Sequence, residues 1–156
     1  MFEVKSYLKQ KNSFIPVSEF NGKIPDPDYV EGAIEISFYE KKILSVKNWD
    51  YVDQLWAYFV NGLIEVSKGI EFKTFLPDQP TRVYLIPDSN LRKVVITVGN
   101  NSSNTISVEY EEFMNVMIEE AKSFFEKMNQ LLSSRYDYEL EQLRSLEKSY
   151  KAKWSN

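Results

Sequence analysis

The chain contains neither cysteine nor histidine, and these two absences remove most familiar catalytic and metal-binding groups. Without cysteine there are no disulfides, thiolate zinc ligands or cysteine nucleophiles. Without histidine, no side chain ordinarily titrates between about pH 5 and 8, which excludes Ser-His-Asp and Cys-His constellations and imidazole-ligated metals. Catalysis would have to rest on carboxylates, lysine, arginine, tyrosine or hydroxyl groups, so an enzyme is the less favoured class.

Glycine is scarce, and long apolar runs are missing. The five glycines stand at scattered positions, none in the spacing of a phosphate-binding loop, so a nucleotide enzyme is not expected. The longest apolar runs, such as VVITV, are too short to span a bilayer, and the start MFEVKSYLKQ lacks the apolar region of a signal peptide. With the lack of cysteine, these features predict a cytoplasmic protein without membrane association.

What remains is ordinary globular composition. The 156 residues are 43% hydrophobic and 27% charged, with a net charge of −4. This length and usage predict one domain over residues 1–156, with residues 135–156 as a candidate helical extension. A net negative charge gives no general attraction to phosphate backbones, so we expect no nucleic-acid partner.

Patterns of apolar residues predict the α+β class. Alternation over residues 33–46 predicts a hairpin, and four short apolar segments separated by turn sequences predict an antiparallel meander over residues 70–109. We expect an antiparallel sheet of about five to six strands, packed by a helix near residues 50–68 and by a long C-terminal helical segment, 110–153. That segment is one helix or two, and its end either folds back or meets another subunit. Residues 1–31 give no clear pattern.

The segment NWDYVDQLWAYFVNG carries five aromatic residues at the start of the predicted helix. Leu55 and Trp56 belong to its apolar stripe, which we expect to face the sheet. Tyr51, Tyr58 and Glu65 are spaced by seven residues and lie beside that stripe. Two interpretations stay open: boundary positions with packed rings and wet hydroxyls, or part of a protein interface.

An acidic stretch opens the C-terminal helical segment, because residues 109–127 contain six acidic and two basic side chains. Acidic residues near a helix N-terminus favour its dipole, and they also form a surface suited to a basic partner. Glu111, Glu112 and Glu119, together with the three residues beside the apolar stripe, make up our candidate interaction surface.

Other charged groups have a structural and a functional interpretation. Asp26 and Asp28 have the spacing of a metal-binding pair, and Asp78 and Asp88 would form a paired-carboxylate site if their turns met at one end of the sheet. Turn formation is the simpler interpretation of all four, since each lies beside proline. Lysines near aromatic residues, as in some single-strand nucleic-acid binders, occur at both ends of the chain: Lys5, Lys9, Lys11, Lys148, Lys151 and Lys153.

The sequence therefore favours a small acidic binding protein whose partner is another protein. An immunity-type protein that neutralises a toxin is one concrete form, by analogy of class alone. One alternative is a domain that binds a small molecule or hydrolyses it with carboxylates, in a pocket lined by Trp56 or Tyr84. Another is a structural oligomer assembled through the C-terminal helix. We assign no catalytic residue, cofactor or metal ligand.

Overall fold

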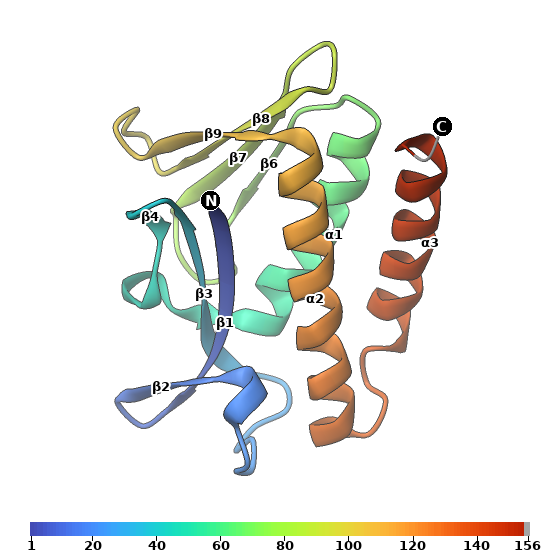
Figure 1. Cartoon of the computed structure of the whole chain (residues 1–156). Coiled ribbons are helices and arrows are strands. Elements are labelled where there is room, and N and C mark those ends of the chain that lie inside the picture. Colours follow the sequence, from blue (N-terminus) through green and yellow to red (C-terminus); the bar gives the residue numbers. More distant parts are fainter. Residues whose placement is uncertain (155–156) are drawn as a thin grey trace.

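The protein is an α+β fold, as predicted, with its strands divided between two antiparallel sheets of five and four strands (Figure 1). The computed structural model describes the backbone of residues 1–154 and the side chains of residues 1–151. The first sheet has the order β2–β1–β3–β4, with β5 paired to β3. Its strands are β1 Phe2–Gln10, β2 Ser13–Pro16, β3 Glu31–Phe38, β4 Lys41–Leu44 and β5 Asp50–Tyr51. The second sheet has the order β6–β7–β8–β9: Phe72–Phe75, Arg82–Pro87, Lys93–Val98 and Thr105–Glu109.

Strand β1 is the main element that the sequence pattern did not reveal. It lies between β2 and β3, and its buried positions Phe2, Val4, Ser6 and Leu8 alternate with more exposed ones. A serine in the middle of the buried set breaks the apolar alternation, which explains why residues 1–31 gave no clear strand signal. The loop from β2 to β3 contains a single 3-10 turn, η1 Val17–Glu19.

The predicted hairpin and meander are both present. Strands β3 and β4 pair around a turn in which Tyr39 takes the left-handed conformation, with φ of 56°, that glycine usually supplies. Strands β6 to β9 pair consecutively, so neighbouring turns lie at opposite ends of the sheet. Asp78 precedes β7 and Asp88 follows it, and these two carboxylates therefore do not form a paired site.

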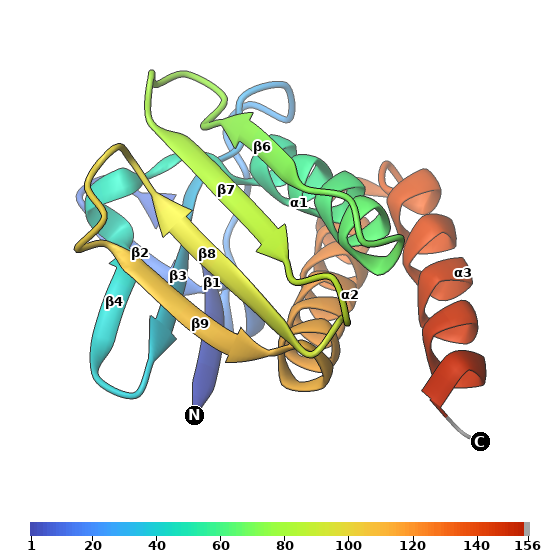
Figure 2. The same cartoon turned by 90° about the horizontal axis from the view of Figure 1, so that it is seen from above.

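The helices are α1 Val52–Ser67, α2 Tyr110–Leu132 and α3 Asp137–Trp154. Helix α2 packs beside α1 against the sheets, and α3 covers both helices on the side away from the strands (Figures 1 and 2). The apolar stripe of α1 is inside as predicted, since Leu55, Trp56 and Phe59 are all buried. Gly69, two residues after the end of α1, terminates the helix: it has a φ of 77°, and its N–H donates to the carbonyl of Val66.

The C-terminal segment is two helices, and the second folds back on the first. Ser133 and Ser134 both adopt positive φ, and the side chain of Asn129 accepts from the N–H of Tyr136 at 2.7 Å. The Tyr136 hydroxyl then donates to Asp53 on α1 at 2.7 Å. Burial raises the pKa of Asp53, although this hydrogen bond acts in the opposite direction. Helix α3 thus packs against α1 and α2 of its own chain.

A close contact between α1 and the second sheet gives a stability prediction. A Cβ at Gly62 would lie 2.6 Å from Cδ2 of Phe72 and 3.0 Å from Cδ1 of Leu85. At an exposed helix position Gly→Ala would stabilise by up to about 1 kcal/mol, but overpacking here costs about 1–3 kcal/mol. We expect Gly62→Ala to lower the free energy of unfolding in urea. The exposed neighbour Asn61→Ala is the control and should be neutral or slightly stabilising; a Gly62→Ala variant more stable than wild type would contradict this packing.

Candidate binding groove

A chain of hydrogen bonds joins three elements in the interior. The indole N–H of Trp56, on α1, donates to the Ser6 hydroxyl oxygen at 2.9 Å. The Ser6 hydroxyl, on β1, donates to Oε2 of Glu120 on α2 at 2.8 Å. Trp56 is completely buried and Ser6 is 4% exposed, so these side chains are shielded from water and satisfy one another's hydrogen bonds. The serine therefore connects both helices to the strand.

Helix α2 covers an edge of β1 that β2 leaves open. Strand β2 pairs with residues 7–10 of β1, so residues 2–6 have no strand partner on that side. The N–H of Phe2 donates to Oε2 of Glu112 at 3.1 Å, and Ser6 binds Glu120 four residues further along. Eight helical residues rise about 12 Å, and four strand residues span about 13 Å, so the two glutamates match the strand spacing. The open edge is thus closed by carboxylates rather than by another strand.

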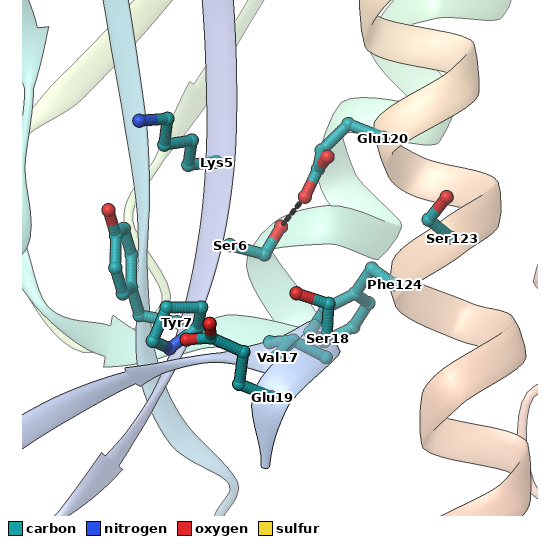
Figure 3. A pocket seen from close by; sticks show the side chains of 10 residues that line it. Lys5, Ser6, Tyr7, Val17, Ser18, Glu19, Glu120, Ser123 and Phe124 are labelled. Carbon is teal, nitrogen blue, oxygen red and sulfur yellow. Dashed lines mark hydrogen bonds between the residues drawn. The ribbon is translucent and has the colours of Figure 1, made fainter.

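A groove of about 440 Å³ lies beside this contact, between β1, η1 and α2. Ser6 and Glu120 point toward each other across it, and Ser18 and Glu19 come from η1 on the other wall (Figure 3). Pro16, Val17 and Phe124 add apolar lining, and Ser123 stands at the rim on α2. Lys5 also borders the groove, but its side chain extends from the opposite face of β1, away from Glu120 (Figure 3).

The electrostatics of the groove centre on Glu120. Burial raises the pKa of the Glu120 carboxyl group above its usual value, and the nearby Glu119 adds to the rise. The hydrogen bonds from the Ser6 hydroxyl and backbone N–H lower the same pKa without cancelling the effect of burial. Glu120 is therefore a half-buried acid held in place by neutral donors.

A second hollow of about 480 Å³ lies between α2 and α3 and meets the groove at Ser123. Glu119 and Glu126 line it and are exposed. Glu147 also lines it but is paired with Lys122 at 3.0 Å and with Lys151 at 3.6 Å. Glu119 and Glu126 thus lie in the hollow adjacent to the groove, on the same helix as Glu120.

The three glutamates of the candidate interaction surface have different roles. Glu111 and Glu119 are exposed, and Glu119 stands beside Glu120 at the border of the two hollows. Glu112 is half-buried and accepts from the N–H of Phe2, so part of its role is structural. The carbonyl of Glu111 accepts from the hydroxyl of Tyr150, which helps to hold α3 against α2.

The other three residues of that surface lie on β5 and α1. Tyr51 pairs with Glu31 in the first sheet, and its ring packs against Tyr29 with 5.4 Å between centroids. Tyr58 and Glu65 are on α1. All three are partly buried, which fits boundary positions better than an open patch. These three residues therefore lie on other elements than Glu111, Glu112 and Glu119, which all belong to α2.

The remaining charged candidates occupy turns or the surface. Asp26 accepts from the N–H of Asp28, Asp28 pairs with Arg135, and Asp88 accepts from the N–H of Arg92. Across residues 1–151, no group of three or more carboxylates is arranged to hold a metal ion. Of the lysines near aromatic residues, Lys9 lies 4.7 Å from the ring centre of Trp49. The side chain of Lys153 lies outside the described residues.

Sequence reasoning missed Ser6, Glu19 and Glu120 as a group. In the small-molecule alternative, Trp56 would line a pocket, but it lies behind Ser6 and reaches Glu120 only through two successive hydrogen bonds. Tyr84 lines a different hollow, on the second sheet with Thr97 and Thr105. The available signal was one serine among the buried positions of β1, which marks a polar contact in the core.

Comparison of the chain with protein-family models, curated proteins and solved structures found no match. None of the helices within the described residues is long and apolar enough to cross a bilayer. The function is therefore inferred from the geometry and charge of the groove.

Removal of the Ser6 hydroxyl should destabilise the fold. Ser6→Ala leaves the buried indole N–H of Trp56 without its acceptor, and a lost partner of this kind costs about 1–3 kcal/mol. It also takes the hydroxyl donor from Glu120, which keeps the backbone N–H of residue 6. Chemical denaturation should show this loss in the free energy of unfolding. Ser123→Ala, at the exposed rim of the same groove, is the matched control and should change little. Equal stability of the two variants would show that the buried chain of hydrogen bonds contributes nothing.

The raised pKa of Glu120 predicts how stability depends on pH. Between the unfolded value near 4.5 and the higher folded value, the folded protein binds more protons than the unfolded chain. Glu120 therefore contributes a loss of stability as pH rises through this window, and Glu120→Gln removes that contribution. We expect the stability of wild type relative to Glu120→Gln to decrease from about pH 4.5 upward. Glu119→Gln controls for the loss of one charge on α2. If the stability of wild type relative to Glu120→Gln rose with pH, the raised pKa of Glu120 would be refuted.

Proposed function

We propose that the protein binds a basic protein partner over the groove between β1, η1 and α2. The observation that carries this proposal is the groove itself, which has a half-buried carboxylate from Glu120 and a second carboxylate from Glu19. The exposed Glu119 and Glu126 lie next to it, on the same helix. Complementary charge of this kind speeds encounter with a cationic partner and selects against acidic ones.

The net charge of −4 agrees with such a role, since the whole chain attracts a basic protein. An immunity-type protein that masks a basic toxin in the cytoplasm is the concrete form we favour, and the lack of cysteine suits that reducing compartment. Assembly through the C-terminal helix is less favoured, because Leu140, Leu143 and Leu146 of α3 are already buried against the rest of the chain.

Capture of the partner, with two charge-reversed variants, tests the proposal. The immobilised protein should retain a polypeptide of basic isoelectric point from a lysate of the cells in which it naturally occurs. Glu119→Lys with Glu126→Lys should abolish retention, because both side chains line the hollow that meets the groove at Ser123. Glu40→Lys with Glu71→Lys changes the net charge equally at two exposed positions away from α2 and should retain the partner. Retention should also weaken as salt is raised.

Two results would overturn the proposal. One is equal retention by both charge-reversed variants, which would assign the binding to another surface. The other is recovery of a tightly held small molecule and no polypeptide, which would favour the small-molecule alternative.

A further inference from the structure

We propose that the groove receives an arginine side chain of the partner, whose guanidinium binds the carboxylate of Glu120. This inference rests on the proposed function and names the group that anchors it. Glu120 is half-buried at the junction of β1 and α2, while the exposed glutamates of α2 are only at the border. A partly desolvated carboxylate gains more from a cation than an exposed one does, because water screens the pair less.

Within residues 1–151, no basic side chain forms an ion pair with Glu120. Glu147, in the neighbouring hollow, is instead paired with two lysines, and the hydrogen bond from Lys122 lowers its pKa. Lys5, the basic residue of the groove, extends from the other face of β1 (Figure 3). A half-buried acid held by neutral donors is the arrangement that an incoming cation completes.

The distribution of acceptors favours guanidinium over ammonium. Glu120 and Ser123 lie on the α2 wall, and Ser18 and Glu19 lie on the η1 wall. A guanidinium group has five N–H donors that point outward from a rigid plane, so one group can serve both walls. Pro16 and Val17 line the groove next to these acceptors and provide contact for the methylene stem. A lysine ammonium presents its donors from one point and serves fewer of these acceptors.

The test uses three small probes on the full chain: N-acetyl-arginine methylamide, its lysine counterpart and its citrulline counterpart. Citrulline has nearly the shape of arginine and no charge. Titrations followed by amide and indole NMR signals should show saturable shifts at the Ser6 amide and the Trp56 indole N–H with arginine. Lysine should bind more weakly and citrulline should cause no saturable shift. Equal responses to arginine and citrulline, or binding of lysine as tight as that of arginine, would overturn the proposal.

Variants locate the site of binding. Glu120→Gln should abolish the arginine response, and the exposed neighbour Glu119→Gln should largely keep it. Ser123→Phe fills the groove from an exposed rim position, leaves Glu120 intact and should also abolish the response. Arginine should bind more weakly as pH falls through the raised pKa of Glu120, because the protonated acid carries no charge. A response unchanged in both Glu120→Gln and Ser123→Phe would show that the probe binds elsewhere.

The probe and capture experiments fail in different ways. A partner that is captured through Glu119 and Glu126 while arginine leaves Ser6 unaffected would reject the anchor and keep the proposed function. Binding of the arginine probe with no captured polypeptide would keep the cation site and reject the protein partner.

Discussion

The fold depends on one buried polar contact, in which Ser6 of β1 receives the indole N–H of Trp56 and donates its hydroxyl proton to Glu120. An unpaired polar group in this position would be costly, so α1, β1 and α2 must meet in the one arrangement that satisfies all three side chains. The same contact brings Glu120 to the wall of the groove. Stability and the proposed recognition of a cation therefore draw on the same carboxylate.

The partial burial of Glu120 raises the pKa of its carboxyl group and sets the chemistry of the groove. Helix α2 closes the open edge of β1 with carboxylates from Glu112 and Glu120, and the second of these is partly desolvated as a result. An apolar residue in place of Glu120 would avoid the cost of burying a carboxylate, but it would leave the Ser6 hydroxyl proton without an acceptor. A partly desolvated acid beside an open groove is typical of sites that bind ligands, because a cationic ligand offsets the cost of burying the carboxylate.

Elements with a regular pattern could be predicted from the sequence, and those defined by a single exception could not. The inner stripe of α1, the β3–β4 hairpin and the β6–β9 meander follow from apolar periodicity, and all three are present. Strand β1 was not predicted, because Ser6 interrupts its apolar alternation. The groove was not predicted, because Ser6 and Glu120 are 114 residues apart in the sequence and meet only through the packing of α2 on β1. Tyr51 was assigned to the helix, but it pairs with Glu31 as part of β5.

A double-mutant cycle between Trp56→Phe and Glu120→Leu tests the central contact most directly. The first change removes the indole N–H together with part of the buried ring, and the second removes the carboxylate, while Ser6 stays between them. The packing cost of each change occurs in the single and the double variant alike, so it cancels in the cycle. If Ser6 couples the two helices, the two losses of unfolding free energy will be non-additive by about 0.5 kcal/mol or more, and the coupling will vanish in a Ser6→Ala background. Additive losses, or a coupling that survives without the Ser6 hydroxyl, would contradict the account.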